Sequence, residues 1–380
     1  MVKVNAMLLL IPGPVSTNAQ VRAAMAQDLA PWDNDFRPVY AAVRARVLEI
    51  AKGSPETHAS LALQGCGHFA TEAAIRTFVK PGGRILVPAT GSYADRMIRL
   101  AREAGRDVVA LPVSEETPTP PAAVAAALAA DPTISHVGLV YSETSSGVIH
   151  DPVAIGAVVR AAGQRLILDA VSAFGALPLD VSAQPELDVV VFTSNKCLEG
   201  MPGLSFAVAR IDALQGAVGN AGSWSFDYAD IYAHATRAAG SFRFTPPAQV
   251  LVSFKVALDL YDEEGGQLAR LARYRANART LFDGMESIGL RPCLVRDVQG
   301  PIVMNIAAPD DPAWSLQGFV DALKRRGFLI SNFFNTPAPS FRVGCIGAIT
   351  PEDMGRFVIA VDAALDELGI RTRGGARQAA

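Results

Sequence analysis

The chain has 380 residues, of which 50% are hydrophobic and 19% charged, so we expect one large domain and a smaller one. A formal net charge of −3 gives no basic field, which argues against nucleic acid and anionic membranes as partners. The four cysteines are scattered without a CxxC pair, so neither a disulfide framework nor a metal site is expected. No apolar run reaches the roughly 18 residues of a membrane span, and the sequence predicts a soluble, cytoplasmic protein that binds small molecules.

Turn signals and helical patterns occupy the first part of the chain. Residues 1–18 form a turn-rich arm, and helices are expected near residues 18–29 and 37–52. From about residue 59, strand patterns alternate with helical ones, which predicts a mostly parallel sheet with helices on both faces. Seven strands are predicted, at residues 60–64, 84–88, 107–113, 136–142, 165–170, 188–193 and 204–209.

The rest of the chain completes a large domain, assigned to residues 19–284, and adds a small α/β domain at residues 285–370. Residues 219–240 carry several aromatic residues without a clear period and are interpreted as an ordered excursion. Residues 371–380 are expected to be a disordered tail. Helices are predicted near 69–79, 120–130, 248–264, 266–287, 316–326 and 351–368, and strands of the small domain near 302–306, 328–330 and 341–343.

A lysine stands at the end of an apolar predicted strand. The run Val189-Val190-Val191-Phe192-Thr193 is typical of a buried strand, and Ser194, Asn195 and Lys196 follow it. A solvated loop position is the commoner situation for a lysine. Partial burial would instead lower its pKa, so that its free amine can form a Schiff base with an aldehyde cofactor.

A single carboxylate interrupts another strand pattern. Asp169 follows Leu166-Ile167-Leu168, and a buried aspartate needs a cationic or hydrogen-bonded partner because desolvating it alone is costly. A protonated pyridine nitrogen would be such a partner. Lys196 and Asp169 on neighbouring strands are therefore what pyridoxal-phosphate chemistry requires, since the lysine holds the aldehyde and the aspartate keeps the ring cationic.

Other segments carry candidate binding residues with two interpretations each. The Gly65-Cys66-Gly67-His68 turn opens a helix, and it is either an anion cup or a plain tight turn. Tyr93 would either stack on an aromatic cofactor or pack in the core. The hydroxyls of residues 142–147 would either bond to ring substituents or form ordinary turns.

Two more candidates concern the substrate. Trp32 lies on a loop that either packs on the surface or lines a site. Arg342, within an apolar strand, forms either a structural ion pair or a grip on a carboxylate or phosphonate.

Taken together, the chain resembles the fold-type I pyridoxal-phosphate aminotransferases. It is similar to the group of alanine–glyoxylate and serine–pyruvate aminotransferases, and most closely to the transaminases that act on 2-aminoethylphosphonate and pyruvate. The motifs run in order along nearly the whole chain: Pro12-Gly13-Pro14, Trp32-Asp33-Asn34-Asp35, Leu63-Gln64-Gly65, Asp131-Pro132-Thr133-Ile134-Ser135-His136, Ser142-Glu143-Thr144, Asp169-Ala170, Ser194-Asn195-Lys196-Cys197, Phe244-Thr245 and Phe341-Arg342-Val343-Gly344.

The resemblance implies a large domain with a mostly parallel seven-stranded sheet, a small C-terminal α/β domain, and pyridoxal 5′-phosphate as cofactor. It implies that Lys196 is the Schiff-base lysine and proton shuttle, and that Asp169 is the partner of the pyridinium. The remaining implied cofactor contacts are Cys66, Gly67, His68, Tyr93, Thr144, Ser194 and, from the second subunit of a homodimer, Thr245. Arg342 and Trp32 would bind the substrates.

The resemblance also leaves the substrate open at two places. The turn reads Gly65-Cys66-Gly67-His68 where the phosphonate enzymes usually have Gly-Ser-Gly and a small hydroxyl residue, and residues 332–337 lack their Tyr-Pro-Gly-Lys-like pattern. The expected reaction is a ping-pong transfer of the amino group of 2-aminoethylphosphonate to pyruvate. The alternatives are an alanine or serine aminotransferase that uses glyoxylate or pyruvate, and a phosphonate-acting lyase on the same fold.

Overall fold

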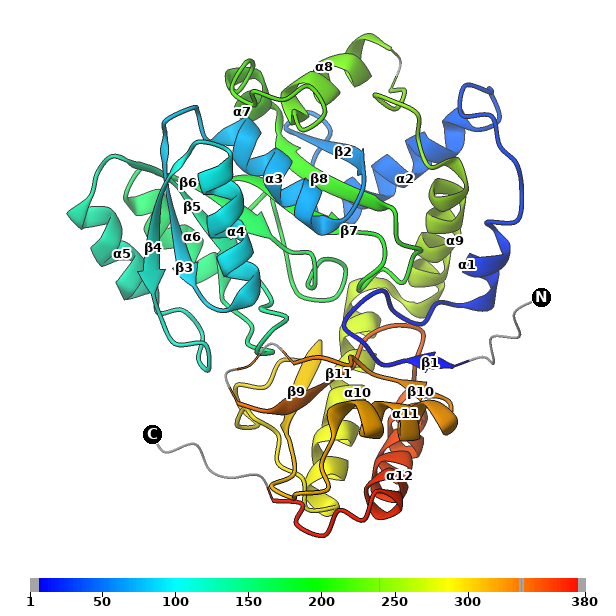
Figure 1. Cartoon of the computed structure of the whole chain (residues 1–380). Helices are drawn as coiled ribbons and strands as arrows, with labels where there is room; N and C mark the ends of the chain where they lie inside the picture. Colours follow the sequence, from blue (N-terminus) through cyan, green and yellow to red (C-terminus); the bar gives the residue numbers. More distant parts are fainter. Residues whose placement is uncertain (1–6, 239, 335, 337, 375–380) are drawn as a thin grey trace.

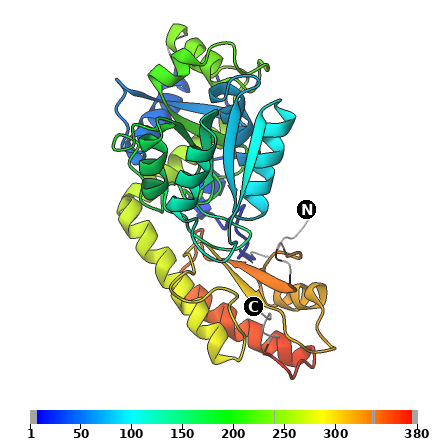
Figure 2. The ribbon, with the colours of Figure 1, turned by 90° about the vertical axis from the view of Figure 1, so that its left-hand side faces the viewer.

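The computed structural model describes residues 7–238, 240–334, 336 and 338–374. Figure 1 shows a large α/β body with a central sheet and a smaller body beneath it. Helices α9 (Ala248–Glu264) and α10 (Gly266–Ser287) connect the two, and the turned view of Figure 2 shows this connection running along one edge of the molecule. Gly265, with φ at +110°, makes the bend between the two helices, a conformation that favours glycine.

The large domain is built on a seven-stranded sheet in the order β2-β8-β7-β6-β5-β3-β4. The five strands from β3 to β7 pair with one another in parallel, whereas β8 is antiparallel to both β2 and β7. All seven predicted strands are present: β2 (His58–Gln64), β3 (Arg84–Ala89), β4 (Asp107–Pro112), β5 (Ile134–Val140), β6 (Arg165–Asp169), β7 (Leu187–Thr193) and β8 (Leu204–Arg210). The prediction of a mostly parallel seven-stranded sheet is thus confirmed.

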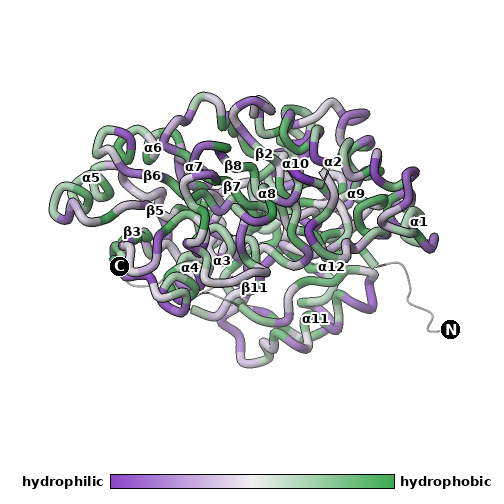
Figure 3. The backbone as a smooth tube through the Cα atoms, turned by 90° about the horizontal axis from the view of Figure 1, so that it is seen from above, coloured by the Kyte–Doolittle hydropathy of each residue, from purple (hydrophilic) through white to green (hydrophobic). Residues whose placement is uncertain are grey.

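Helices cover the sheet, which explains why its central strands are continuous apolar runs. Every residue of β7 is buried, as a parallel strand between two helical layers requires. Figure 3 shows hydrophobic segments through the middle of the large domain around β7 and β8. The helices of this domain, besides α9, are α1 (Ala19–Ala23), α2 (Arg37–Ile50), α3 (Gly67–Phe78), α4 (Ser92–Glu103), α5 (Pro121–Ala130), α6 (Pro152–Ala161), α7 (Ile211–Gly216) and α8 (Tyr228–Arg237).

The small domain contains the antiparallel pair β9 (Val303–Ala307) and β11 (Ser340–Gly344), with Arg342 directly opposite Asn305. The N-terminal arm joins this domain, because β1 (Leu8–Leu9) pairs in parallel with β10 (Phe328–Leu329). Helices α11 (Leu316–Arg325) and α12 (Pro351–Glu367) pack on this unit together with α10. The arm consequently reaches the region between the two domains.

Two local expectations differ from the structure. The aromatic excursion contains the helix α8, whose start is capped by the Asp227 side chain and whose buried Tyr228, Ile231 and Ala235 follow helical spacing. The first predicted helix is shorter than expected and ends near Ala23, after which single turns lead to Pro31.

The predicted tail begins at Arg371. The Arg371 and Thr372 N–H groups donate to Asp311, and residues 375–380 lie outside the described chain.

Candidate active site

Lys196 lies just beyond the end of β7, between the sheet and the N-terminal arm. Its Nζ donates a hydrogen bond to the Pro12 carbonyl oxygen at 2.8 Å. Gly13 follows at a φ of +149°, and a Cβ at this position would come within 2.5 Å of Nζ. The arm therefore approaches the amine so closely that only glycine fits.

Burial lowers the pKa of Lys196 to about 8, and the positive charges of Arg342 and Arg96 act in the same direction. Within the described residues, Lys196 forms no ion pair with a carboxylate. A pKa near 8 leaves about a tenth of the amine neutral at pH 7, roughly 300 times the fraction of an ordinary lysine. Lys196 is thus prepared to act as a nucleophile or a base.

Asp169 is the last residue of β6 and lies opposite Val191 of β7. Its carboxylate accepts hydrogen bonds from the Thr71 hydroxyl and the Val171 N–H, both at 3.0 Å. Burial raises the pKa of Asp169 to about 6, although these two hydrogen bonds pull it downward. No described residue forms an ion pair with this carboxylate, and a cation in the cavity would stabilise its charged form.

A helix N-terminus faces this pair. Gly67 and His68 begin α3, and Cys66 caps the helix with an extended backbone but no side-chain hydrogen bond. A Cβ on Gly67 would lie 2.6 Å from Val171 Cγ2, so the turn packs directly on the segment that follows Asp169. The free N–H groups of the first helical turn suit a phosphate or another anion.

One cavity of about 230 Å³ brings together six of the predicted residues: Cys66, Gly67, His68, Tyr93, Asp169 and Lys196. Three larger cavities, of about 320, 500 and 800 Å³, are lined by neither Lys196 nor Asp169. The smaller cavity is the candidate active site because the groups with opposite pKa shifts meet there.

Several residues that line this cavity were not predicted from the sequence. Thr71 follows Gly67 by one helical turn, and Arg96 follows Tyr93 in the same way, with its guanidinium 4.6 Å from the ring centre. Helical spacing from the predicted residues would have found both. Thr193 also lines the cavity, and its buried hydroxyl has no hydrogen-bond partner.

Arg342 lies beside the cavity in β11, and 2% of its surface is exposed. Its Nη1 donates to the Thr144 carbonyl at 3.1 Å, its guanidinium lies 5.2 Å from the ring centre of Phe333, and its buried Nε has no partner. Burial lowers the pKa of Arg342, and Arg96 contributes to the shift. Asn305, directly opposite, donates to the Ser145 and Ser146 carbonyls at 2.6 and 3.1 Å, so both strands hold the loop that follows Thr144.

The other predicted residues lie outside the cavity. The Thr144 hydroxyl donates to Ser172 Oγ at 2.8 Å, and the Ser194 hydroxyl donates to the Met201 carbonyl at 2.6 Å. Trp32 and Thr245 are exposed on the surface of this single chain. In residues 332–337, the segment that lacks the pattern of the phosphonate enzymes, the Phe333 ring lies over Arg342. Asn335 and Pro337 lie outside the described residues.

The fold and this cavity define a class of enzyme. The sequence model of the class-V aminotransferase family matches residues 20–313, and the chain belongs to this family of pyridoxal-phosphate-dependent aminotransferases. The 2-aminoethylphosphonate–pyruvate transaminase of Burkholderia ambifaria (strain MC40-6) is 44% identical over 363 residues, which cover 96% of either chain. The enzyme of the same name from Pseudomonas putida (strain W619) is 41% identical over 366 residues, covering 96% of this chain and 99% of that one.

Solved structures agree with the fold. Pyridoxamine–pyruvate aminotransferase from Mesorhizobium loti superposes with a TM-score of 0.87 at 26% identity, covering 98% of this chain and 95% of the other. Alanine–glyoxylate aminotransferase from Nostoc sp. superposes with a TM-score of 0.87 at 22% identity, covering 96% of either chain. The resemblance inferred from the sequence motifs is confirmed. The described part of the chain has no helix that is both long and apolar enough to cross a membrane.

Proposed function

We propose that this aminotransferase transfers the amino group of 2-aminoethylphosphonate to pyruvate and releases phosphonoacetaldehyde and L-alanine. The observation that carries the proposal is one cavity in which the pKa of Lys196 is lowered to about 8 and that of Asp169 is raised to about 6, with the buried cation Arg342 beside it. The names of relatives at 41% and 44% identity support the choice of substrates.

The residues of the cavity fit pyridoxal phosphate. Asp169, which forms no ion pair among the described residues, would pair with the protonated ring nitrogen, and the N-terminus of α3 at Cys66, Gly67 and His68 would hold the phosphate. Tyr93 would cover a ring face, and the unpartnered hydroxyl of Thr193 offers a further hydrogen bond. When bound, the cofactor supplies an electron sink for breaking the C–H bond next to the amino group.

Lys196 holds and moves the proton in this mechanism. When its amine is free and neutral, Lys196 would take the proton from the substrate carbon at Nζ and hold it there until it passes to the bound cofactor. The Pro12 carbonyl, 2.8 Å from Nζ, orients the amine through its hydrogen bond. Asp169 would be ionised there, because a protonated ring nitrogen beside it would favour the carboxylate form.

Arg342 would bind the acid group of both substrates in turn. It is almost fully buried, and its Nε has no hydrogen-bond partner among the described residues, so a phosphonate or carboxylate would satisfy it. The Phe333 ring lies over the guanidinium, with its centre 5.2 Å from the guanidinium carbon. Since a single arginine suits either anion, an alanine or serine aminotransferase acting with glyoxylate or pyruvate is the second candidate.

A homodimer would complete the site. Thr245, predicted to contact the cofactor phosphate, is exposed here and follows Phe244, which is 38% exposed. Phe244 packs edge-on against Trp224, which is 67% exposed, and Phe69 of α3 is exposed as well. Phe69 directly follows His68 in the first turn of α3, and Phe244 lines one pocket with it. A second copy would cover these aromatic side chains while bringing its own Thr245, and the exposed Trp32, to the substrate side.

The test uses the purified protein loaded with pyridoxal phosphate. It is incubated with 2-aminoethylphosphonate and pyruvate, and separately with L-alanine and glyoxylate, and the amino and carbonyl products are measured. Phosphonoacetaldehyde and alanine from the first pair are expected. Activity with the second pair alone would move the protein to the carboxylate branch, and ammonia release without any keto acid would identify a lyase.

A further inference from the structure

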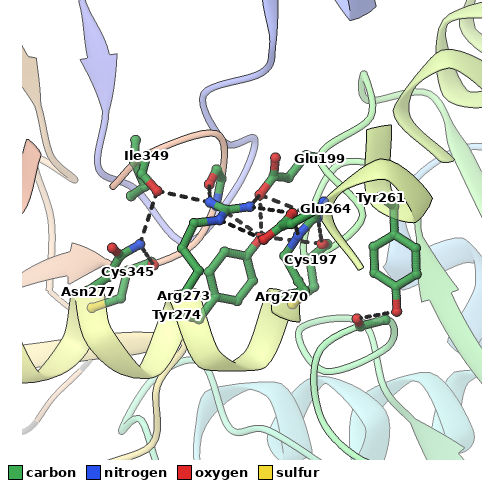
Figure 4. Close-up of polar contacts among 12 residues, drawn as sticks. Cys197, Glu199, Tyr261, Glu264, Arg270, Arg273, Tyr274, Asn277, Cys345 and Ile349 are labelled. Carbon is green, nitrogen blue, oxygen red and sulfur yellow. Dashed lines mark hydrogen bonds and ion pairs between the residues drawn. The ribbon is translucent and has the colours of Figure 1, made fainter. Parts of the chain in front are cut away.

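We propose that Glu199, Arg270, Arg273 and Tyr274 position Lys196 by fixing the turn that carries it against the small domain. With Glu264 these residues form what we call the junction network, and Figure 4 shows their side chains converging between α10 and the Cys197 and Glu199 backbone. The inference goes beyond the substrates, and it rests on the proposed function only in taking Lys196 as the reacting lysine.

The network holds the main chain immediately after Lys196. Cys197 O accepts a hydrogen bond from Arg270 Nη1 at 2.5 Å and lies 3.3 Å from the Tyr274 hydroxyl oxygen. Glu199 Oε1 accepts from Arg273 Nη2 at 2.8 Å and from Tyr274 at 2.6 Å. Glu199 has a φ of +55°, a left-handed conformation that a non-glycine residue keeps only where its surroundings hold it.

The same residues hold a segment of the small domain. Arg273 Nη1 donates to the Gly347 and Ile349 carbonyls at 2.6 and 2.9 Å. One turn further along α10, the buried Asn277 donates to the Cys345 and Ile349 carbonyls at 3.0 and 3.3 Å. Residues 345–349 directly follow β11, the strand that carries Arg342, so α10 fixes the lysine turn and the arginine strand together.

The held segment also reaches the amine of Lys196. Gly344 N–H donates to Leu10 O, and Ala348 N–H donates to Ser16 O, both at 2.8 Å. A Cβ on Gly344 would lie 2.4 Å from Ile11 O, which shows how closely the arm is packed. The next arm residue is Pro12, whose carbonyl accepts the bond from Lys196 Nζ. The network thus fixes both ends of Lys196, the main chain directly and the amine through the arm.

The positive and negative charges of the junction network balance one another. Burial disfavours the charged forms of Arg270 and Arg273, but Glu199 and Glu264 raise the pKa of both guanidinium groups. Glu264 accepts from Arg270 Nε at 2.7 Å and from Arg273 Nε at 2.8 Å. None of these residues lines the 230 Å³ cavity, so they are positioning residues that act through Lys196.

The experiment compares Glu199→Gln and Tyr274→Phe with the wild type, all loaded with pyridoxal phosphate. Glu286→Gln is the matched control, because it removes an exposed carboxylate of α10 that pairs with Arg296 at 2.9 Å. Three quantities are measured: kcat and KM with the active substrate pair, the pH midpoint of the absorbance change of the bound cofactor, and the melting temperature.

For Glu199→Gln we expect a roughly 10- to 100-fold lower kcat with KM little changed, as for a misplaced reacting group, and a shifted pH midpoint. Tyr274→Phe is expected to change both quantities in the same direction by less, and the control to leave them unchanged. A lower melting temperature with wild-type kcat and midpoint in Glu199→Gln would show a merely structural network. If that variant does not fold, Tyr274→Phe decides, and wild-type values in it overturn the inference.

Failure of the proposed function has a different signature. A wild-type protein that shows the cofactor absorbance but no turnover with 2-aminoethylphosphonate would refute the substrate assignment alone. The midpoints of the variants would still report on the network, since this measurement needs no amino donor.

Discussion

The cavity around Lys196 and the junction network both remove charged groups from water, yet their charges behave in opposite ways. In the cavity, Lys196 contacts one carbonyl and Asp169 one hydroxyl and one N–H, and burial brings their pKa values to about 8 and about 6. In the network, carboxylates raise the pKa of Arg270 and Arg273 despite burial. Burial alone therefore does not make a charged group reactive. Burial makes it reactive where the protein supplies no opposite charge and leaves that charge to a ligand.

The largest expected effect comes from removing the reactive amine. Lys196→Ala should lower kcat by about 10⁴-fold, the upper range for a positioned acid–base group, while the folded structure persists. Steady-state rates measure the loss of kcat, and the melting temperature shows whether the variant is still folded. The control is Lys255→Ala, which removes an exposed lysine paired with Asp259 on α9. Normal turnover in Lys196→Ala would show that the cavity is no more reactive than the junction network.

Substitution of Arg342 should have an intermediate effect. Like Lys196, this residue is buried and forms no ion pair with a carboxylate among the described residues. Arg342→Gln is expected to raise KM and so to lower kcat/KM. The loss should correspond to about 2–5 kcal/mol of transition-state binding free energy, as for truncation of a buried charged hydrogen-bond donor. Arg279→Gln, on the exposed side of α10, is the control. KM measured for each substrate separately tells whether Arg342 binds the phosphonate, the keto acid or both, and an unchanged KM for both would assign it a structural role.

The smallest effect is expected at Thr71, whose hydroxyl is one of two donors to Asp169. Thr71→Val removes a bond to the carboxylate form, so the pKa of Asp169 should rise further above 6 and cofactor binding should weaken by about 1 kcal/mol. The loss should be larger at pH 6 than at pH 8, because fewer Asp169 side chains are ionised at the lower pH. Dissociation constants of pyridoxal phosphate at both pH values check this, with Thr71→Ser as the hydroxyl-retaining control.

The same shift fixes the sign of a stability effect in the cofactor-free protein. The folded pKa of Asp169, about 6, lies above the value of about 3.9 for an unfolded aspartate, so the folded state binds more protons between these values. This residue therefore costs stability as pH rises from about 4 to about 6. Thr71→Val should widen that window, and an equal pH dependence in both proteins would contradict the role of the hydroxyl.

The sequence predicted the features that depend on local periodicity. Continuous apolar runs marked the strands of the parallel sheet, and the polar residues Asp169 and Lys196 stood out at strand ends because they interrupt such runs. Helix α8 was missed because its exposed aromatic neighbours, such as Trp224, obscure the spacing of Tyr228, Ile231 and Ala235. Thr71 and Arg96 were overlooked although each lies one turn from a predicted residue.

Contacts between distant segments were decided by the tertiary structure alone. The Pro12 carbonyl meets Lys196 across 184 positions, and Arg273 joins the lysine turn to the Gly347 and Ile349 carbonyls. Such contacts involve main-chain carbonyls, which every residue has, so no residue type announces them. The sequence by itself determined which chemistry is present and which strands carry it. Only the packing of the arm and the small domain on the sheet decided what each charged group meets, because partners are set by position in space and not by spacing along the chain.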